Sequence, residues 1–195
     1  MPALSEPIKL IVGLGNPGEK YRGTRHNAGA DFVAMLAHQH GVTLQPETKF
    51  LGLAGRLQAG DMDIRLLIPT TYMNRSGQAV SSMAKFFKID VANILVAHDE
   101  LDFAPGEARF KIGGGHGGHN GLRDIISAMS ADFVRLRIGI GHPGSAPEVT
   151  NYVLKPASQS DRLLITDSLE RSADTLPMLA AGELAKATHQ LHSSN

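Results

Sequence analysis

The sequence predicts an α/β fold: a twisted mixed β-sheet flanked by helices on both faces. Short apolar runs of strand character alternate with segments whose apolar residues recur at helical spacing, and this alternation favours a sheet covered on both sides. The length of 195 residues suits one domain, and no repeat, low-complexity segment or linker divides the chain. We therefore expect residues 1–195 to form a single domain, with C-terminal helices over about 159–192.

The first half of the chain is expected to contain three strands and two helices. In chain order these are a strand over 8–12, a helix over 28–40, hairpin strands over 51–59 and 62–68, and a helix over 76–88. Gly60 and Asp61 form the hairpin turn. Asn27 is placed to cap the first helix, and Gly41 is placed to end it.

The second half continues the alternation. The predicted elements are a strand over 94–97, a strand over 108–112, a short helix over 122–129 and a strand over 133–140. Asn120 is expected to cap the short helix. The tail from 159 to 192 is helical, and Pro177 is expected to break it because proline lacks the N–H that a helix interior needs.

Composition excludes several classes of protein. Cysteine is absent, which rules out disulfides, thiolate metal sites and a cysteine nucleophile and fits a reducing compartment. The net charge is zero, so any nucleic-acid contact must come from a local basic patch. No apolar run approaches the roughly 20 residues of a membrane span. The opening MPALSEP has no features of a signal peptide. We expect a cytoplasmic protein.

Polar side chains gather in the loop after the first strand, GLGNPGEKYRGTRHNAG. Ligands of open α/β folds bind outside the carboxyl ends of the strands, where this loop supplies Asn16, Tyr21, Arg25, His26 and Asn27. The same loop contains G-x-G-x-x-G, the dinucleotide fingerprint. Pro17 interrupts it, and neither the helix nor the acidic residue that the fingerprint requires follows. No nucleotide cofactor is therefore expected.

Polar residues also follow two other strands and the glycine-rich run. They are Tyr72-Met73-Asn74, His98-Asp99 and His119-Asn120. Parallel strands would bring all of them to one crevice. Taken singly, Asn74 could be a helix cap, Asp99 could cap a turn and His26 could be an ordinary loop histidine.

Taken together, these residues favour hydrolysis of an ester. A histidine held by a carboxylate is a competent general base that can activate water. Asparagine side chains can donate to an oxyanion, and no G-x-S-x-G elbow offers a serine nucleophile. His116 and His119, with His98 and Asp99, could be interpreted as a metal site, but the spacing of His116 and His119 in a glycine run does not match a helical ligand pair, so no metal is expected.

A local basic patch accompanies these groups. It consists of Arg109, Lys111, Arg123, Arg135 and Arg137. Such a patch could hold phosphates without reading sequence, although a solvated strand face would have the same composition.

The chain contains five motifs in this order: GLGNPGEKYRGTRHNAG, PTTYMNRSG, HDELD, GGGHGGHNGLRDI and RLRIGIGHPG. Together they closely resemble the bacterial-type peptidyl-tRNA hydrolase family. The resemblance runs from about Ile8 to Leu154, and the tail fits the family's C-terminal helices. It implies a monomer that hydrolyses the ester between a peptide and the tRNA 3′ end and so recycles tRNA from aborted translation. It implies no metal or cofactor.

The resemblance also implies a role for each site residue. His26 is the general base and Asp99 the carboxylate that orients it. The substrate-binding residues are Asn16, Tyr21, Met73, Asn74, His119 and Asn120, and the residues that clamp a tRNA phosphate are Lys111 and Arg137. The chain departs from some relatives at Ser145-Ala146-Pro147-Glu148, where they carry lysines, and we expect weaker contact with the tRNA backbone there. The alternative is a non-catalytic RNA-binding relative with the same fold.

Overall fold

The computed structural model describes residues 5–194, which contain a seven-stranded sheet in the order β2-β3-β4-β1-β5-β7-β6. The strands are β1 (Leu10–Gly13), β2 (Gln45–Glu47), β3 (Gly52–Ala59), β4 (Met62–Pro69), β5 (Ile94–Glu100), β6 (Ala108–Ile112) and β7 (Val134–Gly139). The α-helices are α1 (Ala28–Gln39), α2 (Ser76–Phe87), α3 (Asn120–Ala128), α4 (Val149–Val153), α5 (Gln159–Ala173), α6 (Leu176–Ala180) and α7 (Leu184–Ser193). Short 3-10 helices lie in several of the loops.

The sheet is mixed, as the sequence predicts. Its central strands β4, β1, β5 and β7 run parallel to one another, and β2, β3 and β6 are antiparallel to their neighbours. The carboxyl ends of the four parallel strands therefore lie at one edge of the sheet. This is the edge at which an open α/β fold binds its ligand.

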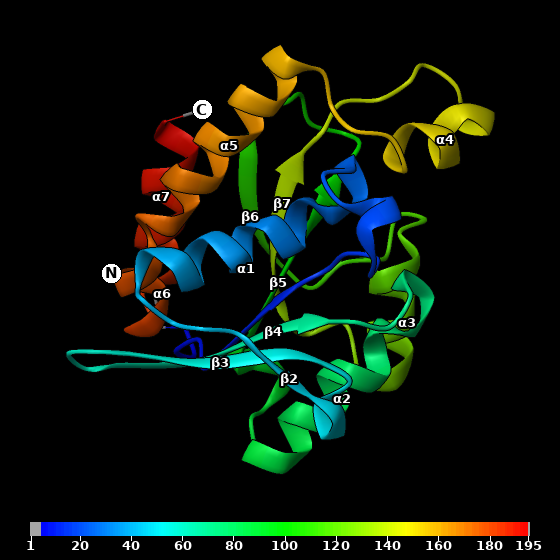
Figure 1. The fold of residues 1–195 in the computed structure, drawn as a ribbon. Coiled ribbons are helices and arrows are strands. Elements are labelled where there is room, and N and C mark those ends of the chain that lie inside the picture. The colour runs from blue at the N-terminus through cyan, green and yellow to red at the C-terminus, as the bar shows by residue number, and fades with distance from the viewer. Residues whose placement is uncertain (1–4, 195) are drawn as a thin grey trace.

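Helices cover both faces of the sheet (Figure 1). One face packs against α1, α5, α6 and α7, and the other packs against α2 and α3. Successive residues of a strand point to opposite faces, so Leu95 of β5 belongs to the first core and Val96 to the second. Burial on both faces explains why the central strands are continuous apolar runs.

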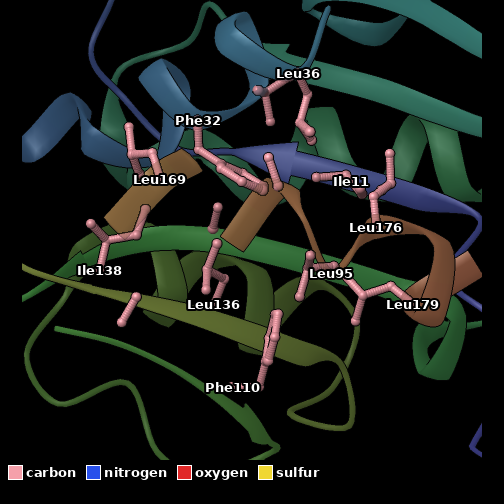
Figure 2. Close-up of a cluster of buried hydrophobic side chains, with 14 of the residues drawn as sticks. Ile11, Phe32, Leu36, Leu95, Phe110, Leu136, Ile138, Leu169, Leu176 and Leu179 are labelled. Carbon is pink, nitrogen blue, oxygen red and sulfur yellow. The ribbon is translucent and has the colours of Figure 1, made fainter. Parts of the chain in front are cut away.

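The first core is the larger cluster of side chains (Figure 2). Phe32 of α1 and Leu169 of α5 pack against Ile11, Leu95 and Leu136 of the central strands. All five side chains are 5% exposed or less. This packing fixes α1 on β1 and β5, and with it the polar loop that precedes α1.

The predicted elements are confirmed, with corrections at their ends. Strand β5 continues beyond 97 to Glu100, because His98 and Asp99 pair with Arg137 and Ile138 of β7. The short β2 is polar and α4 has five residues, so neither shows a recognisable period. Pro177 lies in the first turn of α6, where its missing N–H costs nothing, and the tail forms three helices.

The prediction that Gly41 ends α1 is confirmed, since α1 stops at Gln39 and Gly41 has a φ of 65°, but both predicted N-terminal caps are wrong. The side chain of His119, not of Asn120, accepts the first N–H groups of α3. Asn27 occupies the cap position of α1 but makes no capping bond, because its side chain pairs with the backbone of Asn16 instead.

Within residues 5–194, none of the helices combines the length and hydropathy that crossing a membrane requires. The expectation that MPALSEP is no signal peptide falls partly on residues 1–4, which lie outside the described part of the chain.

Candidate active site

A cavity of about 750 Å³ opens at the carboxyl edge of the parallel strands. Its wall contains side chains from the loop after β1, the turn after β4, the end of β5 and the glycine-rich segment, residues 113–118. The predicted site residues that line it are Asn16, His26, Met73, Asn74, Asp99, Lys111, His119, Asn120 and Arg137. Tyr21, in the 3-10 helix Glu19–Tyr21, is not among the residues that line the cavity.

His26 is held against the carboxylate of Asp99. Its Nδ1 lies 2.9 Å from Asp99 Oδ2, and the two side chains are 12% and 3% exposed. The start of α1 approaches β5 so closely that a Cβ on Gly29 would lie 2.1 Å from the Ala97 carbonyl oxygen. A larger residue at this position would push His26 away from Asp99.

The hydrogen bonds define the tautomer of His26. An ionised carboxylate only accepts hydrogen bonds, so Nδ1 carries the proton that Asp99 accepts. Nε2 then holds the lone pair, and it has no hydrogen-bond partner among residues 5–194. Since His26 lines the cavity, this nitrogen is free to take a proton from a bound water.

His119 contacts the same carboxylate, but both of its ring nitrogens are occupied. Nε2 lies 2.8 Å from Asp99 Oδ1, while Nδ1 accepts from the backbone N–H groups of Gly121 and Leu122 at the start of α3. These bonds select the neutral imidazole with its proton on Nε2. His119 is therefore a donor to Asp99 and has no lone pair left for a substrate proton.

Burial and charge shift the pKa values of Asp99 and His26 in opposite directions. Burial alone would raise the pKa of Asp99, but its interactions with His119 and His26 outweigh this and hold that pKa well below its usual range. Burial alone would lower the pKa of His26, but the Asp99 charge and hydrogen bond raise it overall. Asp99 is thus ionised at neutral pH, and His26 is a stronger base than a free imidazole.

Asn16 is locked in one orientation. Its side-chain oxygen accepts from the Met73 backbone N–H at 2.8 Å, and its backbone is clamped by the side chain of Asn27. Since the oxygen is engaged, the amide NH₂ is the part left to donate into the cavity.

Met73, Asn74 and Asn120 complete this part of the wall. Met73 is buried at 5% exposure, and its backbone N–H is the group that orients Asn16. Asn74 is exposed and makes no side-chain hydrogen bond in the described part of the chain. The side-chain oxygen of Asn120 accepts from Arg123.

The basic residues divide into two groups. Lys111, Arg135 and Arg137 line the cavity. Arg137 stacks on the ring of Phe103 and lies 4.0 Å from Glu100. Arg109 pairs with Glu107 outside the cavity. Arg123 also lies outside it, so the structure assembles only part of the patch expected from sequence.

Arg135 is the clearest departure from that expectation. It is only 4% exposed and donates to the ring of His98 and to backbone carbonyls of the glycine-rich segment. The sequence predicts Arg135 as part of a phosphate-binding patch and offers His98 only as a member of the metal site that is not expected. No pattern in the sequence reveals that these two side chains meet.

His26, Asp99 and His119 also have the composition of a metal site, since their potential ligand atoms lie within 4.8 Å of one another. However, each histidine is bonded directly to the carboxylate, at 2.9 and 2.8 Å. A cation bound there would have to replace both bonds and the cap of α3. The donor set therefore fits a hydrogen-bonded cluster better than a metal centre.

Comparisons with known proteins identify the same family as the motifs. The model of the family described as peptidyl-tRNA hydrolase matches residues 10–195. The peptidyl-tRNA hydrolase of Teredinibacter turnerae is 55% identical over 193 residues, covering 98% of this chain and 100% of that protein. That of Saccharophagus degradans is 56% identical over 188 residues, covering 95% of each.

Solved structures agree in fold. The crystal structure of peptidyl-tRNA hydrolase from Acinetobacter baumannii superposes with a TM-score of 0.93 at 49% identity over 96% of both chains. A point mutant of the Acinetobacter protein gives a TM-score of 0.96 at 47% identity, covering 99% of this chain and 98% of that chain. The family model and these relatives span nearly the whole sequence, and on these grounds the chain belongs to the peptidyl-tRNA hydrolase family.

Proposed function

We propose that this chain hydrolyses the ester bond between a peptide and the 3′ end of tRNA, with His26 as the general base. The observation that carries the assignment is the free Nε2 of His26. Two histidines bind Asp99, and of these two only His26, which lines the cavity, keeps a ring nitrogen without a partner among residues 5–194. Family membership indicates the substrate class, and the difference between the two histidines supports His26 as the general base.

In the proposed reaction, His26 Nε2 removes a proton from water as the oxygen adds to the ester carbonyl carbon. The imidazolium formed is stabilised by the Asp99 carboxylate, which keeps the ring in the productive orientation. When the tetrahedral intermediate collapses, the C–O bond to the tRNA ribose breaks. The leaving oxygen then takes the proton from His26, which restores the base.

The amide of Asn16 is suited to stabilise the negative oxygen of the intermediate. Its orientation is fixed by the Met73 backbone before substrate binds, and donors fixed in advance contribute most to such stabilisation. Asn74 and Asn120, with the wall formed by Met73, are proposed to contact the peptide and the ribose end. Tyr21 lies outside the cavity wall, so its proposed part is limited to supporting the loop that carries His26.

His119 is proposed to orient Asp99 rather than to bind substrate directly, because both of its nitrogens are engaged. Lys111 and Arg137 are proposed to hold a tRNA phosphate at the far side of the cavity. Their position in the wall and the guanidinium fork of Arg137 suit a phosphate.

We further propose that the chain works as a cytoplasmic monomer and as one functional unit. The wall of the cavity is complete within one chain, so the site needs no second copy. The C-terminal helices α5, α6 and α7 share the core with α1, which supports treating the whole chain as one unit. Peptidyl-tRNA is produced by ribosomes, and the absence of cysteine suits a reducing compartment.

The decisive experiment is release of an N-acetyl-aminoacyl group from tRNA, measured with EDTA present for the parent and for His26→Ala. We expect rapid release by the parent and almost none by the variant. Release that stops with EDTA would favour a metal mechanism. A folded parent that binds tRNA without cleaving it would favour the alternative, an RNA-binding protein without catalysis.

A further inference from the structure

Two buried polar residues of the cavity wall, His98 and Arg135, take no part in the reaction described above. His98 of β5 is 1% exposed, and Arg135 of β7 is 4% exposed. Neighbouring residues of a strand point to opposite faces, so His98 projects away from the side on which Asp99 meets His26. A buried arginine is rare unless its donors are satisfied, and its partners indicate what it does.

His98 orients the guanidinium of Arg135. Its Nδ1 lies 2.9 Å from the backbone carbonyl of Asp99, and because a carbonyl only accepts, Nδ1 carries the proton. Nε2 must then accept, and it does so from Arg135 Nε at 3.2 Å. Burial, together with His119 and Arg135, holds the pKa of His98 well below its ordinary value, so the ring stays neutral and remains an acceptor.

Arg135 in turn holds the glycine-rich segment. Its Nη1 donates to the carbonyl oxygens of Gly113 at 3.2 Å and Gly115 at 2.9 Å. The segment passes so closely that a Cβ on Gly114 would lie 3.1 Å from Arg135 Nη1. At its far end the segment delivers His119 to Asp99.

We propose that Arg135, oriented by His98, is a positioning residue that acts through His119. By anchoring two carbonyls of the glycine-rich segment, it places the His119 donor on Asp99 and so fixes the carboxylate that serves His26. The competing interpretation is that Arg135 binds a tRNA phosphate beside Lys111. Arg135 does line the cavity, but its burial and the use of Nε and Nη1 within the protein favour the positioning role.

This inference rests on the proposed esterase function, and a double-mutant cycle tests it. Arg135→Lys keeps the charge but cannot reach His98 and both carbonyls together, so we expect kcat to fall roughly 10- to 100-fold with KM unchanged. In a His119→Asn background the same substitution should have little further effect, because coupled residues are non-additive. Arg56→Lys, on an exposed ion pair of β3, is the matched control and should leave kcat unchanged.

Two results of this cycle would overturn the proposal. Fully additive losses would show that Arg135 does not act through His119. A raised KM with unchanged kcat would make Arg135 a tRNA contact.

A second pair of variants leaves Arg135 in place and decides the question if Arg135→Lys does not fold. The amide of His98→Gln reaches the position of Nε2 and can still accept from Arg135, whereas His98→Asn mimics only the Nδ1 end. We expect the Gln variant to retain several-fold more kcat at equal melting temperature. An Asn variant as active as the Gln variant would contradict the proposal.

A measurement without substrate separates this inference from the esterase assignment. Nitrogen NMR of the imidazole groups should show His119 with a slowly exchanging Nε2–H in the parent and lose that signal in Arg135→Lys. Loss of the signal supports the positioning role even if the parent releases no peptide, in which case the proposed function fails alone. An unchanged His119 signal would refute the positioning role whatever the activity.

Discussion

The imidazole rings of His26 and His119 lie 4.9 Å apart, centre to centre, and both donate a hydrogen bond to the carboxylate of Asp99. Their second nitrogens differ. His26 Nε2 has no partner in the described part of the chain, whereas His119 Nδ1 is occupied by the first N–H groups of α3. The carboxylate is thus supported on one side by a fixed neutral donor and on the other by a ring that can gain and lose a proton.

His119→Asn should separate the two functions of His119. Asparagine is a good N-cap, so α3 and the melting temperature should be largely retained, but its side chain cannot reach Asp99. Losing a hydrogen bond to a charged group costs about 1.5–3 kcal/mol, so we expect kcat to fall roughly 10- to 100-fold. Steady-state kinetics and thermal melting measure the two effects.

His119→Ala is the matched comparison, since it removes the cap as well. It should lose about 1 kcal/mol of stability relative to the Asn variant without a much larger loss of kcat. Equal kcat for His119→Asn and the parent would show that Asp99 needs no second donor.

Asp99→Asn should lower kcat by roughly 10²–10⁴-fold, because an amide in this position no longer fixes the His26 tautomer or stabilises the imidazolium. Binding of tRNA should be retained, because Lys111 and Arg137 are untouched. Single-turnover release and tRNA binding are the measurements. If the melting temperature fell in step with activity, Asp99 would be a structural rather than a chemical requirement.

The pH dependence of kcat/KM should report His26. A general base works only when unprotonated, so activity is present above its pKa and is lost as the pH falls through it. Asp99 raises that pKa, which places the acid limb above 6.5, the ordinary value for histidine. In Asp99→Asn the limb should move to lower pH, because the charge that raised the pKa is gone.

A pH profile with an unshifted acid limb in Asp99→Asn would mean that another group controls the reaction. The residual activity of that variant is sufficient for this comparison if enzyme is supplied in excess over substrate.

The sequence predicts where the site lies because the position of the site depends on local patterns. Each central strand is a short apolar run followed by polar residues, and parallel strands bring their carboxyl ends together. Asn16, Met73 and Asp99 lie in one cavity wall for this reason. Local patterns do not predict β2 and α4, because these elements are too short to show a period of apolar residues.

The sequence could not predict which hydrogen bond each side chain makes. His119 and Asn120 are adjacent, yet His119 rather than Asn120 caps α3. Arg135 and Arg137 are two residues apart on one strand and both line the cavity, yet Arg135 donates to His98 while Arg137 lies over the ring of Phe103. These assignments depend on how the glycine-rich segment crosses the sheet, which is a tertiary property without a sequence period.

Asn16→Asp tests the oxyanion role with a minimal change of shape. The aspartate can still accept the Met73 N–H, so the loop should keep its geometry, but a negative acceptor replaces the amide donor. We expect kcat to fall about 10²–10³-fold, as when an oxyanion donor is removed, with the melting temperature nearly unchanged. A variant that kept most of its kcat would assign stabilisation of the oxyanion to Asn74 or Asn120.

Lys111→Ala and Arg137→Ala should weaken the recognition of tRNA without changing the chemistry. Each phosphate contact makes a salt-dependent contribution to the binding of tRNA. Each variant should therefore raise KM and reduce the slope of log KM against log salt by about 1. On a short substrate that carries the same ester on adenosine alone, both variants should match the parent, because that substrate has no phosphate to hold. Arg56→Ala provides the control for loss of an exposed positive charge. If the variants lost activity equally on the short substrate, Lys111 and Arg137 would act in catalysis, and the phosphate contacts would have to lie elsewhere on the surface.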